Sequence, residues 1–365
     1  MIDHRFLDLA IRLGDRGLGR TGANPSVGCV LVRDGQIIGV GHTSEGGRPH
    51  AERVALAQAG NAKGSDAYVT LEPCAHHGQT SPCANALIEA GIARVICPIQ
   101  DPDPRVGGKG FAMLRDAGIK VVHPKINKIP AGLKPFLFAK SLGRTMITLK
   151  SATTIDGKIA LANGKSQWIT CEETRKVTRA MRAQFDAIIV GIGTVIADNP
   201  SLNVRTIGLE SHAPRPVILD THCRTPIDAK LFEISKPILF HGENSQPSEE
   251  LKAKAECMAT PLENNTVSIE FVATRLAKLG FNSALIEGGA KLAVSALKAD
   301  VVDQIIHVSA SKLIGADGIS AIGNLELESM VSLPQFTRTH LQTIGDDVLS
   351  FYDSRRLNIS DFYPT

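Results

Sequence analysis

The twelve residues from Glu72 to Cys83, EPCAHHGQTSPC, place two cysteines and two histidines in one short stretch. Such a cluster indicates either a disulfide framework or a metal site. The chain has 7 cysteines among 365 residues, and the N-terminal segment MIDHRFLDLAIRLGDRG carries charges throughout, without the apolar core of a secretory signal. An odd number of scattered cysteines and no export signal favour the reducing cytoplasm, and therefore a metal site.

A histidine upstream completes a set of metal ligands. His50, Cys74 and Cys83 suit zinc, and Glu52 supplies a carboxylate beside them. A structural zinc site is closed by four protein ligands, whereas a catalytic site leaves a position open for water. Three ligands with a spare carboxylate therefore favour catalytic zinc, and we expect Glu52 to be the catalytic residue that moves the proton of the activated water.

The order of these residues matches the zinc deaminase signature, H-x-E followed by P-C-x-x-C, with one difference. Eight residues, AHHGQTSP, separate the two cysteines here instead of two, and we expect this loop to form part of the substrate pocket. Two alternatives stay open at this point. In the first alternative, the two cysteines are ordinary small buried residues that bind no metal. In the second, the zinc is structural and takes a fourth ligand from His76 or His77.

The rest of the chain reads as two α/β units. In the first third, a helical stripe precedes a hairpin around Arg33-Asp34-Gly35, and helices and strands then alternate, which predicts a layered and partly parallel sheet. The proline-containing stretch 124–144 lacks a clean period and predicts a linker. We therefore expect a first domain over 1–123 and a second α/β domain over 145–365.

Charge and hydropathy exclude some classes of function. The formal net charge of +3 is too small to indicate a nucleic-acid surface by itself. The longest apolar run, AIIVGIGTVIA, is 11 residues, well short of a membrane span. We therefore expect a cytoplasmic protein whose partner is a small molecule, with no nucleic acid and no membrane.

Several longer motifs point to one family. NPSVGCVLV, GHTSEGGRPHAE and YVTLEPCAHHGQTSPC resemble, in order and spacing, the N-terminal half of the bifunctional riboflavin-biosynthesis deaminase/reductases. LKSATTIDGKIA, RAQFDAIIVGIGTVIADNP and IEGGAKLAVSAL resemble the C-terminal half. The resemblance covers essentially the whole chain. It implies a cytidine-deaminase-like three-layer α/β/α domain followed by a dihydrofolate-reductase-like α/β domain.

For the first domain the resemblance implies hydrolytic deamination of 2,5-diamino-6-(5-phosphoribosylamino)pyrimidin-4(3H)-one to the corresponding uracil. It assigns zinc to His50, Cys74 and Cys83, proton transfer to Glu52, and substrate binding to Asn24, His42 and His76. Position 79 is Gln, where the family usually has a cation suited to the ribose phosphate. Arg48 is the alternative that we expect to bind this phosphate.

For the second domain the resemblance implies NADPH-dependent reduction of the ribosyl group to a ribityl chain. The pair Gly288-Gly289, after a predicted strand and before a predicted helix, allows a backbone approach to a pyrophosphate. The implied cofactor residues are Ala152, Trp168, Thr194, Asp198, Thr221, Gly289, Ala290, Lys291, Leu292, Ala293, Val294 and Ser295. The implied substrate residues are Ser166, Arg182, Leu202, Arg205 and Glu287.

Two details of phosphate binding follow from residue chemistry. Arg182 and Arg205 are expected to form a phosphate clamp, because guanidinium groups bind phosphate in a bidentate manner. Arg224 is the cation that we expect to bind the 2′-phosphate of NADPH. No strong acid or base for the hydride step is evident in the sequence.

Other classes of function remain to be distinguished. A nucleic-acid base deaminase predicts a basic groove and a C-x-x-C pair, and a zinc-stabilised binding module predicts four zinc ligands and no need for Glu52. The family resemblance further implies a homodimer or homotetramer.

Overall fold

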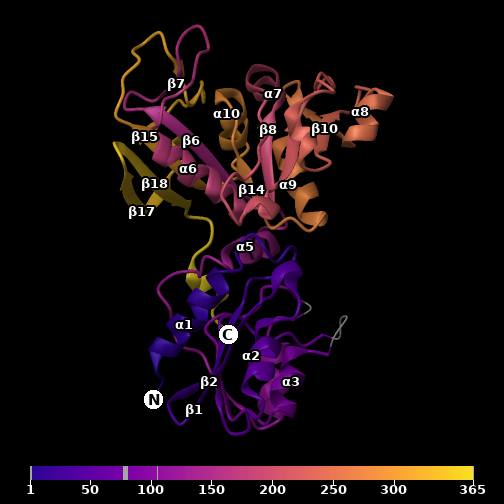
Figure 1. The fold of residues 1–365 in the computed structure, drawn as a ribbon, viewed down its shortest axis with the longest axis vertical. Helices are drawn as coiled ribbons and strands as arrows, with labels where there is room; N and C mark the ends of the chain where they lie inside the picture. Colours follow the sequence, from indigo (N-terminus) through magenta and orange to yellow (C-terminus); the bar gives the residue numbers. More distant parts are fainter. Residues whose placement is uncertain (1, 77–80, 105, 365) are drawn as a thin grey trace. The chain divides into compact units, whose positions relative to one another are not determined.

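The chain divides at Gly143 in the computed structural model, which describes residues 2–76, 81–104 and 106–364. The first unit comprises Met1–Gly143 together with Leu357–Thr365, and the second comprises Arg144–Arg356 (Figure 1). No helix among the described residues combines the length and apolar character needed to cross a bilayer.

The first unit is built around one five-stranded sheet with the order β2-β1-β3-β4-β5. Its strands are β1 (Gly28–Arg33), β2 (Gln36–His42), β3 (Asp66–Val69), β4 (Arg94–Ile96) and β5 (Lys120–Val122). Its helices are α1 (His4–Asp15), α2 (Ala51–Ala59), α3 (Cys83–Glu89), α4 (Lys109–Asp116) and α5 (Lys134–Leu142). β1 runs antiparallel to both β2 and β3, whereas β3, β4 and β5 are parallel.

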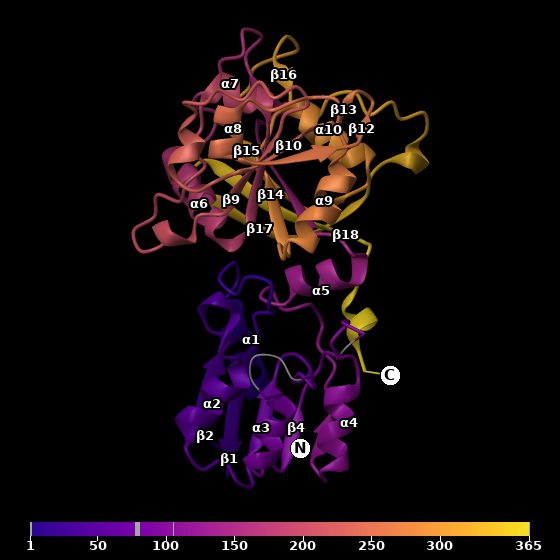
Figure 2. The same cartoon turned by 90° about the vertical axis from the view of Figure 1, so that its right-hand side faces the viewer.

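Alternation along β1 explains the three layers of this unit. Cys29 and Leu31 pack in the core that contains α2, α3 and α4, whereas Val30 and Val32 pack against α1. Because successive side chains of a strand point to opposite faces, an apolar run such as CVLV needs cover on both sides. The helices α2, α3 and α4 lie side by side on one face (Figure 2).

The second unit contains a nine-stranded sheet with the order β11-β10-β9-β8-β14-β6-β15-β18-β17. Its strands are β6 (Met146–Thr154), β8 (Ala187–Gly191), β9 (Arg215–Leu219), β10 (Ile238–Gly242), β11 (Glu256–Thr260), β14 (Ser283–Ile286), β15 (Val302–Ala310), β17 (Phe336–Ile344) and β18 (Asp347–Ser354). Short strands β7 (Lys158–Ala160), β12 (Leu262–Glu263), β13 (Thr266–Val267) and β16 (Ile319–Ser320) pair outside it. The helices are α6 (Glu172–Met181), α7 (Ile192–Asp198), α8 (Glu249–Lys254), α9 (Ile269–Lys278) and α10 (Ala290–Lys298).

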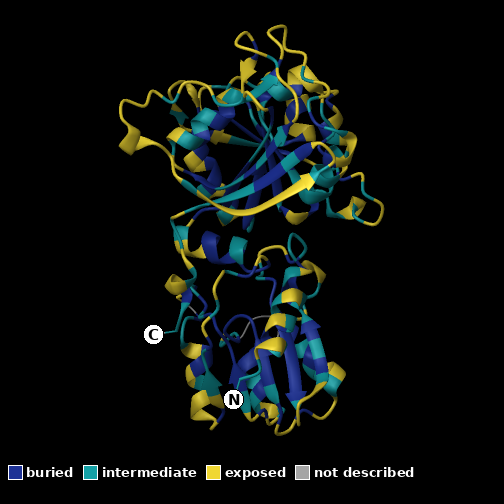
Figure 3. Ribbon diagram, turned by 90° about the vertical axis from the view of Figure 1, so that its left-hand side faces the viewer, coloured by how far each residue is buried: buried dark blue, intermediate teal, exposed yellow. Residues whose placement is uncertain are grey.

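This sheet is parallel from β11 to β15 and ends in the antiparallel strands β18 and β17. Ile189 and Ile286 face the core that includes α9 and α10, whereas Ile188 and Leu285 face the core that includes α7. Figure 3 shows these central strands as buried and the edge strand β17 as exposed. Because helices cover both faces of a parallel sheet, ligands commonly bind at the carboxyl ends of its strands.

The structure differs from the expected boundaries in two places. The stretch 124–144 contains α5, whose Phe136 and Leu137 are buried in the core of the first unit. Pro135 lies in the first turn of α5, where the missing N–H costs no helical hydrogen bond, so the prolines did not preclude a helix. The segment from Leu357 groups with the first unit, not with the second.

Candidate active sites

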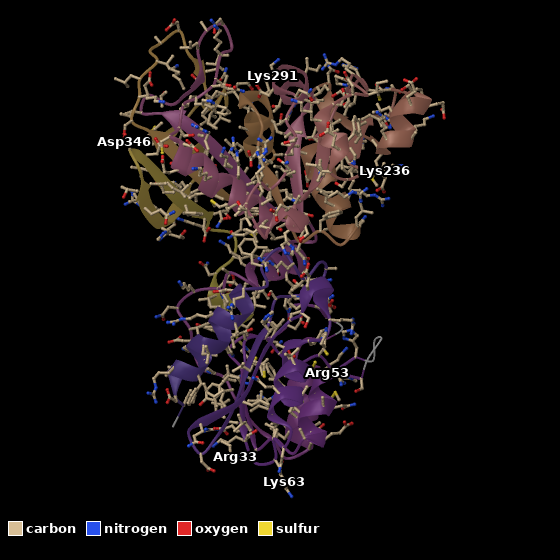
Figure 4. All side chains as sticks on the ribbon, viewed as in Figure 1. Arg33, Arg53, Lys63, Lys236, Lys291 and Asp346 are labelled. Carbon is tan, nitrogen blue, oxygen red and sulfur yellow. The ribbon has the colours of Figure 1, made fainter. Side chains whose placement is uncertain are left out.

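The three expected zinc ligands come together at the start of two helices. His50 is the N-cap of α2, and Cys83 is the first residue of α3. Cys74 follows β3, and its Sγ accepts a hydrogen bond from the Cys83 backbone N–H at 3.3 Å. On α2, Arg53 (Figure 4) donates to the Ser81 carbonyl at 2.7 Å and so helps to fix the approach to Cys83.

The ligand atoms have the spacing that zinc requires. His50 Nδ1 lies 3.7 Å from Cys74 Sγ and 3.4 Å from Cys83 Sγ, and the three ligand atoms all lie within 4.8 Å of one another. Tetrahedral ligands at the usual Zn–S and Zn–N lengths stand about 3.6 Å apart, so the donors fit this ion in both identity and spacing. A hydrogen bond with Cys83 and a further one with His50 lower the pKa of the Cys74 thiol to about 4 against the effect of burial, which favours the thiolate that a metal binds.

Glu52 lies on the wall of the same pocket and is 3 % exposed. His50 has an extended backbone (φ −70°, ψ 159°) and therefore stands outside the helical turn that begins at Ala51. This geometry lets residues 50 and 52 share a pocket, although two residues so spaced within a helix point to nearly opposite sides. Burial, with the negative charge of Cys74 added to it, raises the pKa of the Glu52 carboxyl.

The pocket beside the zinc ligands has a volume of about 240 Å³. It brings together Asn24, His76 and Arg48 of the expected substrate residues. His42 does not line it; its Nδ1 lies 2.9 Å from the Thr43 carbonyl oxygen, and Thr43 takes its place on the wall. Gln79 and His77 lie outside the described residues.

Several wall residues of this pocket carry no signal in the zinc motif. Asp101 and Asp103 follow β4, and Phe136 and Lys140 come from α5. Lys140 Nζ lies 3.6 Å from the Asp103 carboxylate. The sequence DPDP after a strand of a parallel sheet could have indicated the two aspartates, since the carboxyl ends of such strands commonly form sites. Phe136 and Lys140 carry no such signal, because the prolines of 124–144 obscure the helical period of α5.

A second cavity, of about 460 Å³, lies in the second unit. Eight expected residues line it: Ala152, Ser166, Trp168, Arg182, Asp198, Leu202, Arg205 and Glu287. Lys150 also lines it and was missed, although it precedes Ala152 by two positions on β6 and alternation places both on one face.

Arg182 is paired with a carboxylate on the wall of this cavity. Its guanidinium donates to both Glu287 carboxylate oxygens, at 2.8 and 3.0 Å, and to the Asn203 carbonyl at 2.9 Å. Burial opposes the charge of Glu287, but Arg182 and Lys150 together outweigh it and hold the pKa of this carboxyl at about 2. Lys150 Nζ stands 3.9 Å from Glu287. Arg182 therefore organises Glu287, and it lines the same cavity as Arg205.

Further arginines line this cavity. Arg175, Arg179 and Arg205 line it together, and Arg175 lies over the Trp168 ring at 4.5 Å from its centroid. Burial, reinforced by the charges of Arg205 and Arg182, lowers the pKa of Arg179. Converging cations of this kind form a site for an anion.

The remaining cofactor residues lie outside the cavity lining, at the carboxyl ends of neighbouring strands. Thr194 follows β8, Thr221 follows β9, and Gly289 is the N-cap of α10 after β14. A Cβ at Gly191, Gly193 or Gly289 would meet nothing within 4 Å, so the backbone at these strand ends borders open space. This suits a dinucleotide.

The flanking candidates have distinct surroundings. Lys291 is exposed in the first turn of α10 (Figure 4), and Leu292 and Ala293 are buried in the core. Arg224 is exposed near the end of β9, 4.0 Å from Asp220, at the same edge of the sheet as Thr221.

These two sites define a class of protein: a zinc-dependent deaminase joined to a nucleotide-dependent reductase. Residues 1–99 match the model of the cytidine and deoxycytidylate deaminase zinc-binding region, and residues 145–350 match that of the RibD C-terminal domain. The chain belongs to the RibD family, the bifunctional deaminase/reductases of riboflavin biosynthesis. Its cofactors are zinc and NADPH.

Full-length relatives support this membership. Riboflavin biosynthesis protein RibD of Haemophilus influenzae is 40 % identical over 95 % of this chain and 96 % of its own length. The Escherichia coli protein of the same name is 37 % identical over 95 % and 98 %. The Acinetobacter baumannii RibD structure superposes with a TM-score of 0.85 at 35 % identity, covering 96 % of this chain and 98 % of that one. The expected fold classes of both domains, the bifunctional activity and both cofactors are confirmed.

Proposed function

We propose that the pocket of the first unit deaminates 2,5-diamino-6-(5-phosphoribosylamino)pyrimidin-4(3H)-one, and that His50, Cys74 and Cys83 hold its zinc. The observation that carries this proposal is the buried Glu52 on the wall that also presents the three ligands. Zinc supplies a water that ionises near neutral pH. A solved relative from Thermotoga maritima, 32 % identical, is described as a diaminohydroxyphosphoribosylaminopyrimidine deaminase/5-amino-6-(5-phosphoribosylamino)uracil reductase.

In this pocket Glu52 takes the proton of the attacking water and delivers it to the departing amino nitrogen. Its low exposure keeps bulk water from competing for that proton. Asn24, His76 and Asp101 offer hydrogen-bonding groups to the pyrimidine edges. The ribose phosphate lies toward Arg48 and Lys140, the cations of the lining.

In the second unit we propose that residues at the carboxyl ends of β9, β8 and β14 would hold NADPH, which would supply the hydride. Thr194, Thr221 and the N-terminus of α10 would bind its phosphates; within the expected range 289–295, Leu292 and Ala293 are buried in the core. The substrate occupies the cavity, with its phosphate on Arg205, Arg179 and Arg175. Lys150 is the group placed to supply a proton during ring opening, and Glu287, fixed by Arg182, holds the Lys150 ammonium.

The functional division that we propose follows the two units. The deaminase comprises Met1–Gly143 with Leu357–Thr365, and the reductase comprises Arg144–Arg356. We propose further that the enzyme works in the cytoplasm as a homodimer or homotetramer, and sedimentation of the purified enzyme tests the assembly.

Glu52→Gln tests the proton transfer. Gln keeps the size of the side chain but cannot accept a proton, so we expect deamination to fall by about 10²- to 10⁴-fold with zinc still bound. Reduction of the deaminated compound by NADPH should be unchanged. Product masses measured with and without NADPH, and zinc content, check both statements.

The matched control is Glu89→Gln, at an exposed position of α3. It should leave both activities intact. Full deaminase activity in zinc-loaded Glu52→Gln would contradict the assignment and favour a binding role for the metal.

A further inference from the structure

The segment that follows the last strand of the reductase unit is folded into the core of the deaminase unit. It forms a short 3-10 turn, η6 (Ile359–Phe362), with a capping box in which the Asn358 backbone N–H donates to the Asp361 carboxylate at 2.7 Å. This local structure gives the segment a defined shape, so that its apolar side chains emerge in a fixed direction.

Apolar contacts attach this segment to the deaminase core. Phe362 is 3 % exposed and belongs to the same buried cluster as Leu133 and Phe136, while Leu357 and Ile359 pack against that cluster. The Tyr363 hydroxyl donates to the Ile126 carbonyl at 2.6 Å. A fully buried phenylalanine is among the larger single contributions to a core.

One backbone hydrogen bond connects the segment to the deaminase pocket. The Gln100 N–H donates to the Phe362 carbonyl at 2.9 Å. Gln100 immediately precedes Asp101, and Asp101 and Asp103 line the pocket beside the zinc ligands. A shift of the segment would therefore be transmitted to the wall of the pocket.

On its other side the same wall is held by Glu72. Its buried carboxylate accepts hydrogen bonds from the backbone N–H groups of Asp101 at 3.2 Å, Gly108 at 3.0 Å and Gly110 at 2.8 Å. Asp101, Gly108 and Gly110 are thus held by a carboxylate next to the zinc-binding loop, and Gln100 by the carbonyl of Phe362. Among these supports, only Phe362 lies in the segment beyond the reductase sequence.

We propose that residues 357–363 are a positioning element of the deaminase site, with Phe362 as the residue that sets the Gln100–Asp103 wall. This rests on the assignment of the first pocket to the diaminopyrimidine. Phe362 acts through Gln100 and the cluster around Phe136, not by touching the substrate. The deaminase is consequently completed by residues that lie more than two hundred positions after its other elements.

The test compares Phe362→Ala with Phe362→Leu and with Ser360→Ala, an exposed position of the same turn. For each full-length, zinc-loaded variant, KM and kcat are measured for deamination, and kcat/KM for reduction of the deaminated compound. A displaced wall weakens substrate binding, so we expect the deaminase KM to rise about tenfold in Phe362→Ala. It should recover to within about threefold in Phe362→Leu, with zinc content and reduction unchanged, and Ser360→Ala should match the parent.

A purely structural role predicts a different result. Partial unfolding lowers the active fraction, and with it kcat and the zinc content, while the remaining molecules keep the parent KM. An unchanged KM in Phe362→Ala would therefore overturn the proposal, whether kcat falls or not. If this variant does not fold, Tyr363→Phe decides by the same criterion, with an expected KM rise of about threefold for one lost hydrogen bond.

Failure of this inference is separable from failure of the proposed deaminase site. Glu52→Gln lowers deamination by the stated factor only if the pocket is correctly assigned, and it does not alter Phe362. Loss of activity in Glu52→Gln with an unchanged KM in Phe362→Ala rejects the positioning role alone. Full activity in Glu52→Gln rejects the pocket itself, and with it the basis of the inference.

Discussion

Asp101 is a carboxyl group in the wall of the deaminase pocket, 8 % exposed. Burial is the main reason that its pKa rises from 3.8 to about 7, and the negative charges of Asp103 and Glu72 add to the effect. A hydrogen bond from the Asp103 N–H and the charge of Lys140 on α5 oppose it. At neutral pH this group therefore lies close to its titration point.

The raised pKa predicts a pH-dependent effect of Asp101→Asn. The unfolded chain loses the Asp101 proton near pH 4 and the folded chain near pH 7, so this group reduces the free energy of unfolding as pH rises between these values. Asn has no proton to lose and can still accept the Asp103 hydrogen bond. We expect the variant to match the parent at pH 4 and to exceed its stability by about 2–4 kcal/mol at pH 8.

Urea unfolding of the first unit, recorded for the parent and the variant at pH 4 and pH 8, measures this difference in the free energy of unfolding. Glu89→Gln, at an exposed position, serves as the control with no pH-dependent gain. An equal stability difference at pH 4 and pH 8 would show that Asp101 does not titrate in this range.

At the level of residues, the cluster of candidate zinc ligands could be predicted because this combination of residue types and order is rare. The sequence pattern already predicts the helices and strands near whose ends these residues lie, which are His50, Cys74 and Cys83. The pairing of Arg182 with Glu287, 105 positions later, could not be predicted in the same way. An arginine on a predicted helix gives no sign of whether its partner is a phosphate or a carboxylate.

Among the elements, α1 and β1 make an unusually close approach. A Cβ placed on Gly28 would stand 1.8 Å from the Ala10 carbonyl oxygen and 2.8 Å from the Gly14 backbone nitrogen. These are backbone atoms of the helix and its last turn, so no side-chain rotation relieves the contact. Glycine at this position sets the distance between α1 and the sheet.

Gly28→Ala should therefore displace α1 and lower the free energy of unfolding of the first unit by about 1–3 kcal/mol or more. Gly193→Ala in α7, where a Cβ meets nothing within 4 Å, is the matched control and should be neutral or slightly stabilising. Calorimetry of both variants without cofactor checks the comparison. A neutral Gly28→Ala would mean that α1 packs less closely than described.

Elements with a clear period were predictable, and those defined by distant contacts were not. The short apolar runs CVLV and AIIV are typical of strands that are buried on both faces, as β1 and β8 are. Prolines obscure the helical period of α5 in the sequence, and η6 has too few residues to show any period. These two elements are held in place because Phe136 and Phe362 are buried in a core whose other residues are distant in the sequence.

At the scale of the whole molecule, the buried clusters do not cross from one unit to the other among the described residues. Two clusters, which include Leu31 and Val30, are drawn from the first unit, and two, which include Ile189 and Ile188, from the second. Units with separate cores are expected to unfold as separate transitions. The three proposed zinc ligands belong to the first unit, and NADPH binding is proposed for the second.

Removal of zinc should therefore affect one transition only. A ligand that binds the folded state raises the stability of the unit that holds it, so chelation should lower the midpoint of the first unit's unfolding by roughly 5 °C or more. The transition of the second unit should stay in place and should instead rise when NADPH is added. Scanning calorimetry of the full chain, with the transitions assigned through Gly28→Ala, measures both shifts. A common shift of both transitions on chelation would show that the two units unfold as one, and that the metal stabilises the reductase as well as the deaminase.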